Sequence, residues 1–220
     1  PNIFLITTFF TLSILSGLSI FISSCKSKAS NTTESKSNSA ENLVIPALFE
    51  RKGELAKSEE WQKTKEKVAE LNQKIASKPN DVKSRLQIVT IYMAEARITG
   101  EHPYYYPAII QILDGVLMME PKNFEANVFK ASVKMSQHQF AEAKELATKA
   151  MNINPDNAYV YGVLVDANVE LGYYDEAVKM SDKMQAMKPS LESYSRASYL
   201  REIYGDYPGA VEAMQMAVKA

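Results

Sequence analysis

Three prolines recur at a fixed interval and constrain the fold more than any other feature. Pro121, Pro155 and Pro189 are equally spaced, each with an apolar residue two positions before it. The residue before a proline is disfavoured in a helix, so each proline is expected to end one unit and start the next. A period of about 34 residues is typical of arrays whose units are pairs of antiparallel helices.

The second half of each unit has its own recurring pattern. An aromatic residue is followed three positions later by an alanine, and seven positions after that by a small or flexible residue. The three sets are Phe140, Ala143 and Ala150; Tyr174, Ala177 and Met184; and Tyr207, Ala210 and Ala217. Alanine lets two helix axes approach to about 8–10 Å, so these segments are predicted to be the second helices.

The first helices fit the pattern less evenly. Their predicted packing positions are Tyr161, Leu164, Val165 and Asn168 in the third unit, and Tyr194, Ala197, Ser198 and Arg201 in the fourth. For the second unit we favour the register Val128, Ala131, Ser132 and Met135, which makes the turn at residues 137–139 one residue short. The alternative register would bury Lys130 and Lys134, which is costly.

The first unit departs from the period, because the interval from Pro79 to Pro121 is longer than the two intervals that follow it. Its helices are predicted over 82–97 and 107–119, with the extra residues in an aromatic insert at 99–106 that contains Tyr104, Tyr105 and Tyr106. Pro107 is expected in the first turn of the second helix, where its missing N–H costs nothing.

A single helix is predicted before Pro79, over residues 58–77. Ser58 can cap it, and the acidic residues that follow suit its N-terminal dipole. One narrow apolar stripe is formed by Trp61, Val68, Leu71 and Ile75. The end of a helical array needs a helix with one buried face and one solvent-exposed face, so residues 41–78 are predicted to form an N-terminal cap.

Residues 1–24 carry no charge and end in Ile22-Ser23-Ser24-Cys25. This ending resembles the lipobox of bacterial lipoproteins, which implies a signal peptide over 1–24 and a lipid on Cys25. Cys25 is the only cysteine, so no internal disulfide competes for it. The alternative is an uncleaved membrane anchor from Ile3 to Ile22, which is long enough to span a bilayer.

Residues 25–40 hold the lipidated cysteine and a run of Ser, Thr, Asn and Lys, which predicts a flexible linker. The residue directly after Cys25 is Lys26 and not the aspartate associated with inner-membrane retention, so we expect anchoring at the outer membrane of the cell envelope, facing the periplasm. Because the sequence starts with Pro1 and stops within a helical pattern, we expect a longer natural product and treat the number of repeats as a minimum.

With these motifs in place, residues 80–220 resemble tetratricopeptide repeat (TPR) proteins, and the whole chain resembles TPR lipoproteins of Bacteroidota-type bacteria. The resemblance implies an all-α fold, a right-handed α-solenoid of antiparallel helix pairs, whose first helices line a partner-binding groove. The repeats over 79–220 are expected at about 80–121, 122–155, 156–189 and an incomplete 190–220.

The sequence nominates no catalytic, cofactor or metal site. The two histidines, His102 and His138, are separated, and no zinc, phosphate-loop or dinucleotide motif occurs. His138 is expected in a turn where glycine is common. The net charge of −1 and the lack of a basic patch beside the aromatic residues argue against a nucleic-acid partner.

If the first helices line the groove, eight residues are predicted to face it: Tyr159, Asp166, Val169, Glu170, Glu192, Ser195, Tyr199 and Glu202. This set is acidic and aromatic, so the predicted ligand is a basic or neutral peptide held by Tyr159 and Tyr199. The simpler alternative is that these acids only solvate an exposed face.

Three functions remain open. The first is a membrane-tethered, non-enzymatic scaffold that binds an unidentified protein of the bacterial envelope. The second is a lipoprotein that binds a carbohydrate or small ligand, for which Tyr104–Tyr106 are the one aromatic platform. The third is the scaffold part of a longer protein with an enzymatic domain beyond residue 220.

Overall fold

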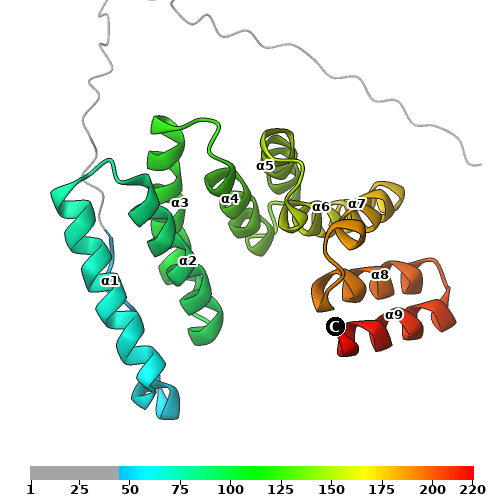
Figure 1. Ribbon diagram of the computed structural model, residues 1–220, viewed down its shortest axis with the longest axis horizontal. Coiled ribbons are helices and arrows are strands. Elements are labelled where there is room, and N and C mark those ends of the chain that lie inside the picture. Colours follow the sequence, from blue (N-terminus) through cyan, green and yellow to red (C-terminus); the bar gives the residue numbers. More distant parts are fainter. Residues whose placement is uncertain (1–44) are drawn as a thin grey trace, which may run out of the picture. The chain divides into compact units, whose positions relative to one another are not determined.

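The computed structural model describes residues 45–220 (Figure 1), and the predictions for Cys25 and for residues 1–40 lie outside this range. The described helices belong to one compact unit. They are η1 (Gly53–Lys57), α1 (Glu59–Ser77), α2 (Val82–Thr99), α3 (His102–Met119), α4 (Phe124–Ser136), α5 (Phe140–Ile153), α6 (Ala158–Glu170), α7 (Tyr174–Met187), α8 (Leu191–Ile203) and α9 (Tyr207–Lys219). Residues 45–220 contain no strand, so the all-α prediction is confirmed for this part of the chain.

Each first helix begins at a side-chain cap just after a proline. Asn123 and Asn157 follow their prolines by two residues and accept hydrogen bonds from the first turns of α4 and α6. Ser190 follows Pro189 by only one residue and forms a capping box with Ser193. This shorter link explains why the start of α8 follows the start of α6 at a slightly shorter interval than separates the starts of α4 and α6.

The turns inside the units are held by one left-handed residue each. His138, Gly172 and Gly205 have φ angles of 58°, 76° and 78°. The N–H of each residue donates to the carbonyl three positions earlier, so the three turns are equivalent. The prediction that His138 occupies a glycine-like turn position is confirmed.

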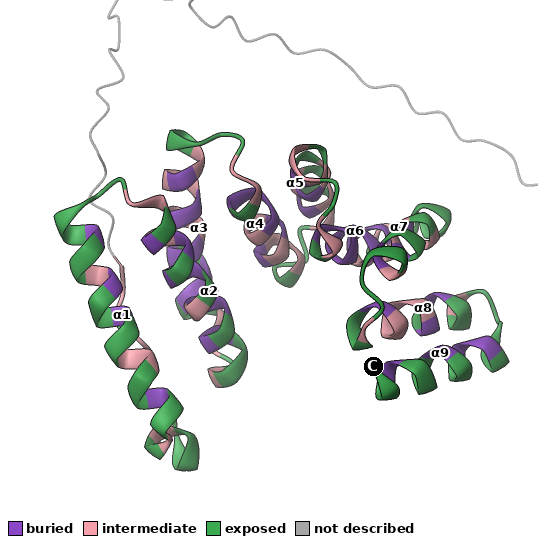
Figure 2. Cartoon of the chain, in the orientation of Figure 1, coloured by how far each residue is buried: buried purple, intermediate pink, exposed green. Residues whose placement is uncertain are grey.

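Consecutive helices pack against one another from α1 to α9. Successive first helices also contact each other, α2 with α4, α4 with α6 and α6 with α8, whereas the successive second helices α3, α5, α7 and α9 do not. The alanines in the first turns of α5, α7 and α9 are buried, and Figure 2 shows that α5 has a buried side. The first helices therefore form one continuous face, and the second helices are separated on the other.

Helix α3 corrects the prediction for the aromatic insert. The helix starts at His102, five residues before Pro107, so Tyr104, Tyr105 and Tyr106 are helical and not part of a loop. Pro107 lies inside the helix, and the carbonyl that its missing N–H would bond to belongs to Pro103 in the first turn. Pro103 occupies the second helical position, where its N–H would have no intrahelical partner, and Pro107 removes one intrahelical hydrogen bond in the second turn.

The register predicted for α4 is also wrong by one residue. Because α4 and α6 start one full period apart, Lys130 and Lys134 occupy the packing positions held by Leu164 and Asn168 in α6. Both lysines keep their charge near the surface: Lys130 Nζ lies 2.6 Å from Asp114 and Lys134 Nζ lies 3.0 Å from Glu142. The aliphatic stems cover apolar surface while the ammonium groups find carboxylates, so the cost used against this register does not arise.

None of the helices between residues 45 and 220 is both long and apolar enough to cross a membrane.

Candidate partner-binding groove

A groove of about 500 Å³ runs along the face formed by the first helices. We call it the first-helix groove. Its walls come from α2, α4, α6 and α8, with Tyr106 of α3 and the end of α7 closing its sides. Its volume lies within the roughly 300–1,000 Å³ typical of ligand sites. The surface is thus a concave site assembled from consecutive repeats.

Three of the eight predicted residues line this groove, namely Tyr159, Asp166 and Glu192. The other five lie outside its lining: Val169, Glu170, Ser195, Tyr199 and Glu202. Of the two predicted aromatic anchors, Tyr159 is 44% exposed and its hydroxyl lies 2.8 Å from Ser132 Oγ of the preceding first helix. The structure therefore brings residues 158–166 of α6 and residues 190–196 at the start of α8 to the groove and leaves the last turns of both helices outside its lining.

An ion pair inside the groove connects α6 to α8. The guanidinium of Arg196 donates from Nε and Nη2 to the two carboxylate oxygens of Asp166, at 2.7 and 2.6 Å. Its Nη1 also donates to the carbonyl of Glu192 at 3.0 Å. Gly162 lies beside this contact, and a Cβ there would come within 3.3 Å of Met184 Cε and 3.4 Å of the Arg196 guanidinium carbon, so the space next to the ion pair is closely filled. A two-pronged contact of this kind fixes geometry as well as charge.

The charges left over in the groove differ from the predicted acidic surface. Asp166 already faces Arg196, while Arg97 and Lys188 also line the groove and take part in no ion pair among the described residues. Glu192 contributes the remaining carboxylate, whose pKa is lowered chiefly by a hydrogen bond from the Ser190 side chain. The groove offers a ligand both signs of charge, with two unpaired cations.

The tyrosines of α3 have another role than a ligand platform. The Tyr105 hydroxyl accepts a hydrogen bond from the Phe49 N–H at 2.9 Å, and the Tyr104 hydroxyl donates to the Ala47 carbonyl at 2.7 Å. Tyr92 of α2 donates to the Pro46 carbonyl in the same way. Residues 45–51, which we call the strap, are thus held by three tyrosine hydroxyls, and only Tyr106 reaches the first-helix groove.

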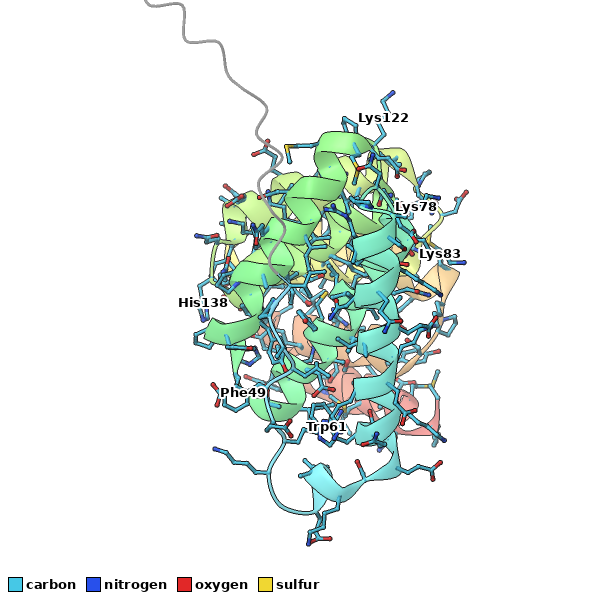
Figure 3. All side chains as sticks on the ribbon, turned by 90° about the vertical axis from the view of Figure 1, so that its left-hand side faces the viewer. Phe49, Trp61, Lys78, Lys83, Lys122 and His138 are labelled. Carbon is cyan, nitrogen blue, oxygen red and sulfur yellow. The ribbon has the colours of Figure 1, made fainter. Side chains whose placement is uncertain are left out.

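The strap ends in a buried ion cluster that sequence reasoning missed. Arg51 bonds Glu95 of α2 through Nε at 3.0 Å, and both side chains are 2% exposed. The same guanidinium pairs with Glu60 and stacks on Trp61 at 4.8 Å from the ring centroid. Figure 3 shows Phe49 and Trp61 near the same end of α1. These carboxylates raise the pKa of Arg51, so it stays charged.

The described residues hold no cluster of three or more metal-binding side chains. His138 stacks edge-on against Phe140, and His102 lies against Tyr106. The Nδ1 of His102 is buried without a hydrogen-bond partner among the described residues. The geometry defines a helical-repeat protein with a groove along its first helices.

Comparisons with known proteins agree with this class. Residues 134–200 match the sequence profile of the TPR_19 family, described as Tetratricopeptide repeat. A search among curated proteins gave no match.

Solved structures share the helical arrangement. A crystal structure of MamA has a TM-score of 0.58 at 18% identity, and the match covers 77% of this chain and 95% of that one. MamA from Desulfovibrio magneticus, from residue 41 to its end, has a TM-score of 0.58 at 16% identity and covers 71% and 84%. TTC0263, a TPR protein of Thermus thermophilus, has a TM-score of 0.59 at 12% identity and covers 69% and 80%. At these identities the likeness establishes the fold, which is a TPR-type helical repeat.

Proposed function

We propose that this protein is a non-catalytic scaffold that holds a segment of a partner protein in the first-helix groove. The single observation that supports this most is the groove itself, which is built from four consecutive first helices of a TPR-type array. A repeat array offers a rigid surface that loses little conformational entropy on binding, so a few anchors suffice to hold a flexible segment.

The charges of the groove refine the expected ligand. Asp166 is neutralised by Arg196, whereas Arg97 and Lys188 are unpaired among the described residues. A partner segment with an apolar side chain against Tyr159 and a carboxylate near Lys188 would satisfy both features. The acidic residues alone predicted a basic or neutral peptide. The expected ligand instead carries a carboxylate, because Arg196 of this chain already pairs with Asp166 and Lys188 is left without a partner among the described residues.

The test compares two tyrosines that the sequence treats alike. Tyr159 lines the groove and Tyr199, which is 55% exposed, does not. Partners captured from an extract of the source bacterium would be identified, purified and measured against Tyr159→Ala, Tyr199→Ala and Lys188→Glu. Loss of a central anchor costs roughly 1–2 kcal/mol, so Tyr159→Ala should weaken binding about 5- to 30-fold.

Lys188→Glu should mainly slow association and flatten the dependence on salt. Tyr199→Ala should leave the affinity unchanged. Equal binding by all three variants, or stronger loss with Tyr199→Ala than with Tyr159→Ala, contradicts the assignment of the groove.

We further propose that the scaffold is anchored by lipid at Cys25 to the bacterial envelope, at the outer membrane facing the periplasm. The support is the uncharged apolar run and the Ile22-Ser23-Ser24-Cys25 ending. Cys25→Ser should abolish processing and lipid labelling. A Cys25→Ser protein that is still processed and stays with the membrane after an alkaline wash would contradict lipidation.

A further inference from the structure

A second groove, of about 780 Å³, lies on the other side of the array, with α7 and α9 as its walls and α8 as its floor. We call it the second-helix groove. It exists because α7 and α9 do not touch, while α8 packs against both. Its apolar surface comes from Val178, Leu200, Ala213 and Met216, one or two from each helix. Leu200 is buried beneath it and Met216 is 44% exposed at its wall.

The corresponding space in the preceding repeat is bridged by the chain itself. There, Lys144 of α5 places its ammonium 4.2 Å from the ring centroid of Tyr173, which follows α6. The position of Lys144 in α5 is held by Val178 in α7, which is too short to reach across. The groove beside α9 is therefore open where its neighbour is crossed by a side chain.

The charges around the second-helix groove do not balance. Its two cations are already paired: Lys179 lies 2.6 Å from Glu176, and Arg201 lies 3.0 Å from Asp206. Two of its acids, Asp182 on α7 and Glu212 on α9, take part in no ion pair or hydrogen bond among the described residues. The side-chain charges without a partner are therefore negative on both walls of the groove, α7 and α9.

Asp175 adds to this field without a cation of its own. Its carboxylate accepts a hydrogen bond from the Tyr204 hydroxyl at 2.6 Å, which closes one end of the groove. A hydroxyl partner stabilises the carboxylate but leaves its charge in place. An apolar floor between two acidic walls is complementary to an apolar side chain flanked by positive charges.

We propose that the second-helix groove binds a short segment of a partner protein in which an apolar side chain is flanked by lysine or arginine. The apolar side chain lies on Val178, Leu200 and Met216, and the flanking cations face Asp182 and Glu212. This surface is separate from the first-helix groove, which holds the two unpaired cations Arg97 and Lys188 beside the carboxylate of Glu192. One protein can therefore hold two partner segments of opposite charge.

The probe is the peptide Gly-Lys-Leu-Arg-Leu-Lys-Gly-amide with fluorescein attached to its N-terminus, and its counterpart is the same labelled peptide with glutamate at every basic position. Binding of both to the purified protein is measured by fluorescence anisotropy. Carbodiimide treatment then joins peptide lysines to carboxylates in contact, and mass spectrometry locates the bonds. The basic peptide should cross-link to Asp182 or Glu212.

The test variant is Asp182→Asn with Glu212→Gln, and its control is Glu125→Gln with Glu145→Gln. The control removes the same charge from exposed acids of α4 and α5 that also lack ion pairs among the described residues. The test variant should weaken binding of the basic peptide by about five-fold or more at low salt, and the control by much less, because only close opposite charges are coupled.

A third variant, Met216→Ala, tests the apolar contact and should weaken binding of the basic peptide by the same factor at low and at high salt. The proposal is overturned if the test variant weakens the acidic peptide as much as the basic one, if both double variants weaken binding of the basic peptide equally, or if the cross-links lie away from α7 and α9. Because Tyr159 and Lys188 are intact in every variant, failure here leaves the test of the first-helix groove unaffected.

Discussion

The buried pair of Arg51 and Glu95 gives the sharpest prediction for stability. Both side chains are 2% exposed, and Arg51 reaches Glu95 from the strap, 44 residues earlier in the chain. Glu95→Ala removes the only buried carboxylate opposite this guanidinium. The charge of Arg51 would remain in a dry site between α1 and α2, with exposed Glu60 as its one acidic partner among the described residues.

Removing one partner of a buried ion pair costs about 3–5 kcal/mol, because the other charge is left uncompensated. Glu60 still pairs with the Arg51 guanidinium, so we expect Glu95→Ala to lower the free energy of unfolding by about 3 kcal/mol, the lower end of that range. Replacing both partners with apolar residues removes the stranded charge. Arg51→Met with Glu95→Leu should therefore lie within about 1 kcal/mol of the wild type.

The assay is urea unfolding followed by the fluorescence of Trp61, the only tryptophan in the chain. Trp61 is 1% exposed and lies under Arg51, so it reports the unfolding of the N-terminal helices directly. A local probe is needed because a repeat array can unfold in parts. The control is Glu70→Ala, which breaks an exposed pair with Lys74 on the same helix and should barely move the midpoint.

Two results would refute the reasoning. One is a Glu95→Ala midpoint no lower than that of Glu70→Ala. The other is an Arg51→Met, Glu95→Leu protein as unstable as Glu95→Ala alone, which would show that packing of the strap and not the stranded charge carries the loss.

Other parts of the fold give three more predictions. His138 has a φ of 58°, a conformation that costs a residue with a Cβ about 1–2 kcal/mol. His138→Gly should therefore stabilise the protein by about 0.5–1 kcal/mol and raise the midpoint of thermal unfolding, and a lower midpoint would count against this. Burial raises the pKa of Tyr92 and Tyr105, and the hydrogen bond to Asp175 raises the pKa of Tyr204, so the unfolded chain releases these protons first and the free energy of unfolding should fall as the pH rises above about 10. Absorbance at 295 nm should show these three tyrosines titrating later than the rest, and titration of all the tyrosines in one step would contradict this. Val211 and Met214 of α9 are 59% and 45% exposed, so the wild-type protein should self-associate as its concentration rises. The double variant Val211→Lys, Met214→Glu should stay monomeric in sedimentation, and a monomeric wild type at every concentration would contradict self-association through α9.

The elements were predictable where the sequence acts locally. Ser58 caps α1 as predicted, and the four apolar residues of its stripe are its four buried residues. The second helices α5, α7 and α9 begin at Phe140, Tyr174 and Tyr207, the aromatic residues of the recurring pattern. These features depend on residues within one or two helical turns, so the chain alone specifies them.

The two errors in the predicted helices share one cause, which is that a single residue was judged apart from its surroundings. Pro107 by itself indicates a helix start, but the helix begins earlier and tolerates the proline near its beginning. The cost of buried charge argues against Lys130 and Lys134 in packing positions, yet each has a carboxylate within 3.0 Å. The partner of Lys130 lies on another helix, and no local pattern reports it.

The groove was predictable as a face but not as a set of charges. The helical period places Tyr159 and Asp166 on one side of α6, and both line the first-helix groove. That Arg196 would neutralise Asp166 depends on the distance between α6 and α8, which the sequence does not give. The strap was missed for the same reason, since Arg51 and Glu95 meet only after three helices have packed.

A comparison of equivalent positions shows how one repeat can carry different sites. The third position after the start of α5, α7 and α9 is always alanine, and these alanines are buried: Ala143, Ala177 and Ala210. The tenth position after the start of α4, α6 and α8 differs in each of the three helices, and its occupants are Lys134, Asn168 and Arg201. Each of these three finds another partner: Glu142, the carbonyl of Leu164, or Asp206. The backbone path depends on the alanines and the left-handed turns, so it repeats, while positions that do not set the path are free to vary in charge. This freedom gives one array a groove with unpaired cations along its first helices and a groove with unpaired carboxylates between its last two second helices.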